Sequence, residues 1–446
     1  MIGKIYIVTD LGPGDGGKGG VVHKIVTSQK AKLVVKFGGG QGSHGIMTDD
    51  GEKFNFSHWG CGTLEGVPTA VAPSFVVIPH AILNEGEMLQ HAGIYDPYDL
   101  LTVDPRAVCA TPLHQIASHL NELMRKDHPR GTIGTGAGEA WRLRYRDDLT
   151  IRFDELDQAP LVRKKLVNLA THYRKRFAMI KDWPSYCLPA DQEEAAYQME
   201  LLQDDEYIDW TLEQYVQLLE TNIKIQCLTS VLNYYDGTAV AECSHGVLTD
   251  AEVGFIPHVS AIRTVPNLII ETLRDEGFLG RYVKLGVTRA YAIRHGAGPL
   301  PTADDKMVNM LLPGSSKDEN RMQGKVRVGV LDFNLLRYAI ECCGSKFFNG
   351  ICVTWMDQIQ KNGVWKVCDQ YDYNSKTGQV IPRIESMDVS KLSQSELAEL
   401  CQKVFLEKLD VPVRMISFGP DDQNKLLLGG TTHGGEKGSE NPGDDR

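Results

Sequence analysis

Several features are missing from this 446-residue sequence, and each absence excludes a class of protein. No run of 18 apolar residues occurs, so no membrane-spanning helix is expected. The N-terminal apolar stretch, MIGKIYIVTD, is too short for a signal peptide and leads directly into a glycine turn. The ten cysteines include no C-x-x-C pair, which indicates neither a zinc knuckle nor a disulfide framework. We therefore expect a reduced, cytoplasmic protein.

An excess of positive charge is also missing. Lys and Arg total 47 and Asp and Glu total 58, which gives a formal net charge of −11. This acidic balance argues against nucleic acid as a partner, because DNA and RNA binding needs a basic surface. It does not argue against a nucleotide, because one phosphate needs only a few N–H groups and one or two cations. The hydrophobic content of 42% and the charged content of 24% are those of an ordinary globular protein.

The order of the apolar runs predicts an α/β fold. A strand at 4–9, a glycine turn, a helix at 21–26 and a strand at 33–37 form the start of a large, mainly parallel sheet flanked by helices. Further strands are predicted at 74–78, 238–241, 283–291, 350–354 and 413–416, and helices at 111–125 and 159–180. We expect one domain over residues 1–428 with a helical insertion around 181–235. The polar stretch 429–446 should be a disordered tail.

The first glycine loop has the geometry of an anion site, because it follows a strand and precedes a helix. Its glycines allow a phosphate to approach backbone N–H groups, and Lys18 would neutralise a β- or γ-phosphate. The residue after Lys18 is Gly19, so the P-loop pattern G-x-x-x-x-G-K-S/T is excluded. Asp15 could hold a metal or act as a base. Taken alone, the loop fits a phosphate site or a plain tight turn equally well.

A second glycine loop, residues 38–45, follows the second predicted strand. Two such loops at the ends of adjacent strands would face each other across the crevice where open α/β sheets bind ligands. His44 lies in this loop, and a histidine beside a phosphate can act as a general acid or a charge-stabilising donor. The alternative is a histidine that only satisfies loop carbonyls.

With both loops considered, the sequence resembles the adenylosuccinate synthetase family, whose loops read G-D-E-G-K-G-K and G-G-x-N-A-G-H. Residues 14–20 and 39–44 correspond to them, and the match continues in order to about residue 428. Each further stretch is a weak signal, but their shared order over the full length is strong. These stretches are 133–138 for I-G-T-T-G-R-G, 294–302 for R-V-G-A-G-P-F-P-T, 329–332 for G-W-L-D, 354–357 for T-K-L-D and 417–421 for S-T-G-P-D.

The resemblance implies a homodimeric, GTP-dependent ligase that joins L-aspartate to C6 of a purine nucleotide monophosphate, normally IMP. The γ-phosphoryl group first moves to the purine O6, and the aspartate amine then displaces it at C6. The resemblance makes Asp15 the base that removes the N1 proton and His44 the acid that bonds the γ-phosphoryl group. Lys18 and the loop amides would hold the phosphates, and Mg²⁺ would use Asp15 and Ser43.

The resemblance also implies a set of binding residues. For GTP they are Gly14, Gly16, Gly17, Lys18 and Gly19 at the phosphates, Asp357 at the guanine, and Ser417, Gly419 and Pro420 around it. For the purine nucleotide substrate they are Gln41, His245 at the base, and Thr135 and Ser260 at the 5′-phosphate. Arg146, or Arg144, would reach the phosphate of the other subunit, and Lys325 and Arg327 would grip the aspartate carboxylates.

Several departures from the family pattern cluster around the ligands. Ala137 replaces the arginine of T-G-R-G, Trp355 replaces the lysine of T-K-L-D, and Gly16 replaces the loop glutamate. Residues 324–329 correspond to the family's basic loop for the aspartate carboxylates, but they carry only two cations, Lys325 and Arg327. Arg321 is the cation that would compensate. His245 replaces the glutamine of E-G-A-Q-G, which leaves open a guanine-type substrate such as dGMP.

Two other functional classes remain as alternatives. The first is an inactive nucleotide-binding regulatory protein, although the joint presence of Asp15, Lys18 and His44 argues against it. The second is an unrelated dinucleotide enzyme. It is disfavoured because Lys36 and Phe37 stand where an acidic residue should bind the ribose.

Overall fold

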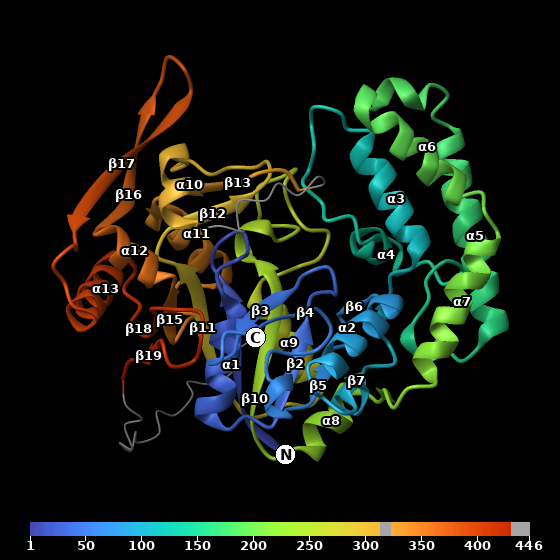
Figure 1. The fold of residues 1–446 in the computed structure, drawn as a ribbon, viewed down its shortest axis with the longest axis horizontal. Coiled ribbons are helices and arrows are strands. Elements are labelled where there is room, and N and C mark those ends of the chain that lie inside the picture. Colours follow the sequence, from blue (N-terminus) through green and yellow to red (C-terminus); the bar gives the residue numbers. More distant parts are fainter. Residues whose placement is uncertain (313–322, 430–446) are drawn as a thin grey trace, which may run out of the picture.

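The computed structural model describes residues 1–312 and 323–429. Its centre is a ten-stranded sheet in which every pairing is parallel except that of the last two strands, β18 and β19 (Figure 1). This confirms the predicted large, mainly parallel sheet. In spatial order the strands are β19 (Lys425–Leu427), β18 (Val413–Ser417), β15 (Gly350–Thr354), β11 (Arg281–Arg289), β1 (Ile2–Asp10), β10 (Gly237–Gly246), β2 (Leu33–Phe37), β5 (Thr69–Val71), β7 (Leu101–Val103) and β9 (Lys224–Ile225).

Helices cover both faces of this sheet, which is why its central strands are apolar almost throughout. Along β1, Ile5 and Ile7 pack in one buried cluster with α8 and α9, while Val8 packs in another with α1. The helices are α1 (Lys18–Gln29), α2 (Pro79–His91), α3 (Pro112–Leu123), α4 (Ala137–Leu143), α5 (Ala159–Ala178), α6 (Gln192–Leu201), α7 (Glu206–Leu219), α8 (Leu228–Tyr234), α9 (Pro266–Asp275), α10 (Asp305–Leu311), α11 (Phe333–Cys343), α12 (Met356–Asn362) and α13 (Gln394–Leu409).

Four small sheets complete the described part of the chain, and one of them extends as the hairpin at the upper left of Figure 1. They are β3 (His44–Met47) with β4 (Lys53–Phe56), β6 (Val76–Val77) with β8 (Val108–Cys109), β12 (Ala292–His295) with β13 (Val326–Gly329), and β14 (Leu331–Asp332) with β16 (Val364–Asn374) and β17 (Gln379–Asp388). The predicted strand at 74–78 therefore forms, but in a small sheet beside the main one.

The predicted adjacency of the first two strands is wrong. β10 lies between β1 and β2 and pairs in parallel with both. Helix α1 connects β1 to β2, which are separated in the sheet by one strand. That strand, β10, comes about 200 residues later in the sequence. The two glycine loops thus flank the end of a third strand.

Helices α6 and α7, within residues 181–235, share a buried cluster with strands of the main sheet. Leu202, Ile208 and Tyr215 belong to the same cluster as Val8 and Val34 of the central strands. In Figure 1, α6 and α7 stand beside α3 and α5 at the right of the molecule. Of the predicted tail, only Gly429 is among the described residues. Among the described residues, 1–312 and 323–429, no helix has both the length and the apolar composition of a membrane span.

Candidate active site

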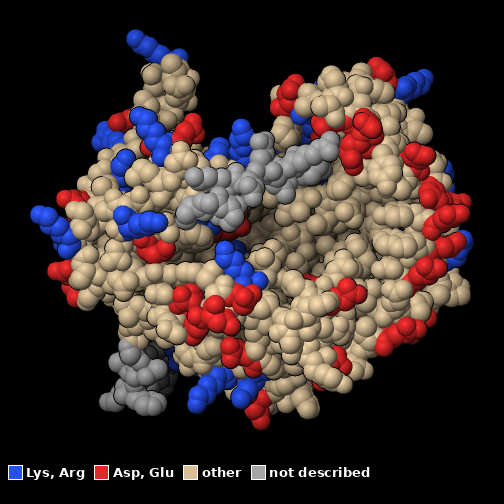
Figure 2. All heavy atoms as spheres, in the orientation of Figure 1, with Lys and Arg blue, Asp and Glu red and all other residues tan. Residues whose placement is uncertain are grey.

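The carboxyl ends of β1, β10, β2 and β11 open into a cleft of about 590 Å³. The face shown in Figure 2 is hollowed at its centre, between the side that carries α3 to α7 and the rest of the chain. The cleft brings together most of the residues predicted for catalysis and for the purine substrate. The predicted residues on its walls are Gly14, Asp15, Gly17, Lys18, Gly19, Gln41, Ser43, His44, Thr135, His245 and Ser260.

The first glycine loop is folded by a buried carboxylate that the sequence analysis missed. Asp10, the last residue of β1, accepts hydrogen bonds from the backbone N–H groups of Gly12 and Gly16, both at 2.7 Å. The same carboxylate lies 3.0 Å from Lys18 Nζ, and both side chains are buried. Asp10 therefore folds the loop back on its own strand and fixes the lysine ammonium at the loop. The acidic residue at the strand end was a visible signal for this role.

The loops at the three strand ends are in direct backbone contact. A Cβ atom on Gly19 would lie 2.3 Å from the carbonyl oxygen of Gly45, and one on Gly246 would lie 2.2 Å from that of Gly12. No real Cβ atom tolerates such distances. These glycines therefore allow the loops to approach closely, and they bring Asp15, Lys18 and His44 onto one cleft.

His44 belongs to a buried ionic network. Its Nδ1 lies 2.6 Å from Glu242 Oε1, which also accepts a hydrogen bond from Lys36 Nζ at 2.8 Å. The other carboxylate oxygen accepts the N–H of Cys61 at 2.9 Å. Burial lowers the pKa of His44 to about 4, although Glu242 opposes the change. The ring is therefore neutral near pH 7, with Nδ1 directed to Glu242 and Nε2 remaining for a ligand.

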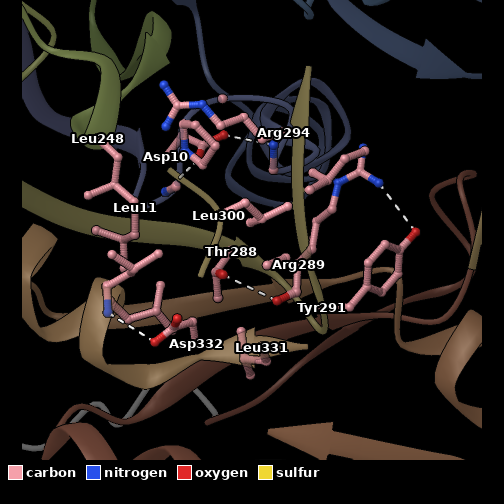
Figure 3. Close-up of a pocket in the computed structure, with 18 of the residues that line it drawn as sticks. Asp10, Leu11, Leu248, Thr288, Arg289, Tyr291, Arg294, Leu300, Leu331 and Asp332 are labelled. Carbon is pink, nitrogen blue, oxygen red and sulfur yellow. Dashed lines mark hydrogen bonds between the residues drawn. The ribbon is translucent and has the colours of Figure 1, made fainter. Parts of the chain in front are cut away.

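Asp15 is partly exposed, whereas Lys18 and His44 are buried. Its backbone has a φ of 58°, its side chain is 54% exposed, and its Oδ2 lies 3.2 Å from His295 Nε2. Arg289 Nε donates to the carbonyl of Asp15 at 2.5 Å, and the guanidinium stacks 4.2 Å from the ring centroid of Trp355. Figure 3 shows Arg289 extending from the end of β11, where its Nη1 lies 3.3 Å from the Tyr291 hydroxyl.

Arg289 and His295 were both missed from the sequence. His295 stands at the valine of the R-V-G-A-G-P pattern, so that departure was a visible signal. Arg289 carried no signal, because its contacts depend on the neighbouring strand ends.

His245 lies at the end of β10, between the two glycine loops, with a φ of 64°. Burial, followed by the charge of Lys18, lowers its pKa to about 4, so the ring is neutral near pH 7. Its Nδ1 and the Oε1 of Gln41 are buried without a hydrogen-bond partner among the described residues. Each unpaired buried atom costs about 1–3 kcal/mol, so this part of the cleft suits a ligand that offers polar partners.

Thr135 and Ser260 reach the cleft from two segments that pack together. Thr135 lies between Gly134 and Gly136, both with positive φ, immediately before α4. Ser260 Oγ accepts the N–H of Ile262 at 3.1 Å. A Cβ on Gly138 would lie 3.2 Å from the Cβ of Ala261, so the two segments adjoin at the start of α4.

The residues predicted for the guanine lie in a separate group at the ends of β15 and β18. Asp357 follows Trp355 at the start of α12, and burial raises the pKa of its carboxyl group. Ser417 Oγ donates to the carbonyl of Gly419 at 3.1 Å. The first glycine loop adjoins this group, because Thr354 Oγ1 donates to the carbonyl of Gly16 at 2.7 Å. The first glycine loop therefore touches both the cleft and the residues predicted to surround the guanine, of which Pro420 is also one.

Three predicted cations do not line the cleft. Arg327 donates to the carbonyls of Gly296 and Gly298, at 2.9 and 2.6 Å, and so supports the loop after His295. The carbonyl of Lys325 accepts the N–H of Gly296 at 2.9 Å. Arg146 pairs with Asp148 at 3.1 Å, and both side chains are exposed. Arg321 lies outside the described residues.

A divalent cation fits the oxygen groups of this cleft. Asp15 and Ser43 both line it, and the Asp15 carboxylate is accessible rather than buried in an ion pair with Lys18. Mg²⁺ prefers oxygen ligands such as carboxylate and carbonyl groups, and residues of the cleft offer both.

Comparison with known proteins gives a consistent result. The adenylosuccinate synthetase family profile matches residues 7–426. The adenylosuccinate synthetase of Shewanella piezotolerans is 25% identical and that of Ectopseudomonas mendocina 26% identical, each over 96% of this chain and 99% of the relative.

Two solved structures share the fold. Fully ligated adenylosuccinate synthetase from Plasmodium falciparum has a TM-score of 0.75 at 18% identity, covering 95% of this chain and 99% of that one. A cyanophage S-2L succinoaminodeoxyadenylate synthetase, bound to dGMP and to dATP as energy donor, has a TM-score of 0.60 at 13% identity, covering 96% of each chain.

Proposed function

Because the chain belongs to the adenylosuccinate synthetase family, we propose that it is a GTP-dependent ligase joining L-aspartate to C6 of IMP. The convergence of Asp15, Lys18 and His44 from two loops onto one cleft is the observation that carries this proposal. A carboxylate, an ammonium and an imidazole are the groups needed to move a phosphoryl group onto a purine oxygen and to displace it again.

In the first step Asp15 removes the N1 proton of the purine, so that electron density moves to O6. O6 then attacks the γ-phosphorus of GTP, and GDP leaves. Proton removal by a positioned carboxylate contributes about 10²–10⁴ in rate. Lys18 and the N–H groups of Gly14, Gly16, Gly17 and Gly19 stabilise the charge on the phosphates, and they need no reorganisation because Asp10 already holds the loop.

His44 acts on the transferred group. Its Nδ1 is directed to Glu242, so a bond from Nε2 to a phosphoryl oxygen requires a protonated ring. Burial disfavours that form in the free protein. The negative charge of the incoming phosphoryl group favours it, and Glu242 stabilises the resulting imidazolium. His44 thereby gains its proton when the phosphoryl group is present.

In the second step the amine of L-aspartate attacks C6, and phosphate leaves with the former O6. The cations proposed for the aspartate carboxylates are Lys325 and Arg327, which lie outside the lining of the cleft. Arg327 also supports the loop beside His295. Asp15 and Ser43 would hold Mg²⁺, which when bound would neutralise negative charge on the phosphates. Asp357, Ser417, Gly419 and Pro420 would bind the guanine of GTP, since two carboxylate oxygens match its N1–H and N2–H₂ groups.

The assembly and compartment are part of the same proposal. We propose a homodimer in the cytoplasm, in which Arg146 faces the partner subunit. All ten cysteines are free thiols, which fits a reducing compartment.

One observation favours a second substrate. His245 stands where the family has glutamine, and it lines the same cleft as Gln41, whose Oε1 is also unpaired among the described residues. A neutral imidazole supplies one acceptor and one donor, and Gln41 supplies a further acceptor, so a guanine edge with its two N–H groups would also be satisfied. The second candidate substrate is therefore dGMP, which would give 2-aminoadenylosuccinate as the deoxynucleotide.

The test is a substrate panel. Purified protein with Mg²⁺, L-aspartate and either GTP or ATP is incubated with IMP, GMP, dGMP or AMP, and products are separated by chromatography. We expect adenylosuccinate from IMP. Turnover of dGMP alone would select the second candidate. Binding of nucleotides without turnover of any of them would instead favour the regulatory alternative.

A further inference from the structure

We infer that His295 is a positioning residue for the proposed base, and that it holds one of the two oxygens of the Asp15 carboxylate while the other faces the purine. The inference rests on the proposed function, because it concerns the proton that Asp15 removes. His295 Nε2 lies 3.2 Å from Asp15 Oδ2, and both residues line the cleft. The family pattern has valine at this position, and a valine side chain offers no polar contact.

The first glycine loop does not itself fix the Asp15 side chain. Asp15 follows Gly14, which has a φ of 121°, and its own side chain is 54% exposed. A cavity of about 50 Å³ lies behind the loop and is lined by Arg294 and Leu300, among others, so packing on that side is incomplete (Figure 3). A base must approach its proton to about 2.6–3.2 Å between heavy atoms. An exposed carboxylate that changes rotamer meets this condition for only part of the time.

The cations nearest to Asp15 in the loop are committed to other groups. Lys18 Nζ lies 3.0 Å from Asp10 Oδ2, and both side chains are buried. Arg289 Nε donates to the backbone carbonyl of Asp15 at 2.5 Å and not to its carboxylate. In the described part of the chain, the contact with His295 is the one ion pair or hydrogen bond that reaches the Asp15 carboxylate. His295 is therefore the group placed to orient it.

His295 has a fixed place in the backbone. It is the last residue of β12 and lies opposite Val326 of the antiparallel strand β13. The next residue, Gly296, has a φ of 62°, and its N–H donates to the carbonyl of Lys325 at 2.9 Å. A Cβ on Gly296 would lie 1.9 Å from the carbonyl oxygen of Gln323, so only glycine fits there. The turn that follows His295 is thus set by close backbone contacts.

Two arginines hold the loop beyond this turn. Arg294 donates to the carbonyls of Ala297 and Pro299, at 3.2 and 3.3 Å. Arg327 donates to two further carbonyls of the same loop, at 2.9 and 2.6 Å. The loop is therefore held from both strands of the small sheet, and the ring of His295 meets the first glycine loop from a defined direction.

This arrangement divides the work between the two oxygens of Asp15. Oδ2 is held by the imidazole, which leaves Oδ1 for the N1–H of the purine. The benefit arises as the proton is transferred, because binding of the substrate depends on its phosphate and on the other residues of the cleft. An interaction that acts at this stage changes kcat and leaves KM nearly constant.

The experiment compares two substitutions of His295 in the full-length protein, with the purine nucleotide that the substrate panel identifies and saturating GTP and Mg²⁺. We expect His295→Val to lower kcat about 10- to 100-fold, the effect of losing a hydrogen bond to a charged group, and to change KM less than about three-fold. His295→Gln should retain kcat within about five-fold, because its amide N–H₂ can take the place of the ring Nε2–H. His91→Val, at an exposed position of α2, is the matched control that should equal the wild type.

A double-mutant cycle shows whether His295 acts through Asp15. In Asp15→Asn no carboxylate remains to be positioned, so adding His295→Val should lower the residual kcat by less than about two-fold. A further loss as large as that in the wild-type background would show that His295 acts independently of Asp15, and would overturn the inference.

Other outcomes would also overturn the inference alone. One is a kcat that is unchanged in His295→Val while Asp15→Asn is inactive. Another is a loss that excess Mg²⁺ restores, which would assign His295 to the metal site. Melting temperatures identify a folding defect, and His295→Leu, closer in size to the ring, gives the same test if His295→Val does not fold. If the wild type converts no purine nucleotide, or Asp15→Asn keeps full turnover, the proposed function itself fails.

Discussion

At the scale of single residues, the proposed reaction requires that Asp15 is a base and not a structural group. Its carboxylate is 54% exposed and forms no ion pair with Lys18, which is paired with Asp10 instead. The sequence identified Asp15, Lys18 and His44 correctly as cleft residues, because local glycine patterns mark loops of this kind. It missed Asp10, Arg289 and His295, whose roles depend on which strand ends become neighbours.

The first prediction concerns Asp15→Asn. We expect kcat to fall by about 10²–10⁴ or more, because the amide cannot take the N1 proton. GTP affinity measured without Mg²⁺ should stay within about three-fold of the wild type, since the loop is held by Asp10. Steady-state kinetics and equilibrium binding check both statements. A variant that retained turnover would remove Asp15 from the mechanism.

The second prediction concerns His245. Because its pKa is lowered to about 4, the neutral ring offers one donor and one acceptor, as a glutamine amide does. His245→Gln should therefore keep kcat/KM for IMP within about ten-fold, whereas His245→Leu should lower it about 100-fold by leaving purine groups unpaired. The ratio of IMP to dGMP turnover in each variant is the measurement. If His245→Gln and His245→Leu changed kcat/KM for IMP and this ratio equally, His245 would not contact the purine.

At the scale of elements, glycine loops and strand ends form the site by backbone contact. Short strands and helices were predictable where apolar runs were continuous, as in β2 and β15. The order of strands in the sheet was not, because the insertion of β10 between β1 and β2 depends on contacts across the whole chain. That insertion is what places His245 between the two loops.

The third prediction concerns the contact between α1 and the second loop. In Gly19→Ala the new Cβ meets the Gly45 carbonyl, a backbone group that must move. We expect a loss of about 1–3 kcal/mol in the free energy of unfolding and at least ten-fold in kcat, because His44 adjoins Gly45. Gly20→Ala is the matched comparison, since its Cβ meets the flexible end of the Lys425 side chain, and it should cost less. If the contact between Gly19 and Gly45 were unimportant, urea unfolding and kinetics would show equal losses of unfolding free energy and of kcat in Gly19→Ala and Gly20→Ala.

The fourth prediction is a loss of stability in mild acid. Burial lowers the pKa values of His44, His80 and His245 to about 4 and that of His114 to about 3, below the unfolded value of about 6.5. The unfolded chain therefore binds more protons in this range. Stability is complete above pH 6.5 and falls as the pH decreases toward 4, by up to about 1.4 kcal/mol per pH unit for each group.

His114 allows a specific check of this effect, because its Nδ1 accepts the N–H of Thr111 at 3.0 Å at the start of α3. Urea unfolding at pH 7.5, 6 and 5 should show a shallower dependence in His114→Gln than in the wild type. The exposed His91, replaced by Gln, should leave the slope unchanged. If the free energy of unfolding depended on pH equally in His114→Gln and in the wild type, His114 would not be a source of the acid sensitivity.

At the scale of the whole molecule, one large sheet positions two groups of predicted binding residues on either side of the first glycine loop. The cleft holds the residues proposed for the purine substrate, and the ends of β15 and β18 hold those proposed for guanine. The overall fold was predictable because ordered motifs span nearly the whole chain. The parts played by Lys325, Arg327 and Arg146 were harder to predict, because a sequence motif does not specify whether a side chain faces the ligand or supports a loop.

The most direct test of the central claim follows the oxygen at C6. IMP labelled with ¹⁸O at this position is incubated with GTP, Mg²⁺ and L-aspartate, and the released phosphate is analysed by mass spectrometry. Transfer of the γ-phosphoryl group to O6, followed by displacement at C6, predicts one ¹⁸O atom in each phosphate formed with adenylosuccinate. Phosphate that carries no label while the product is formed would contradict the account.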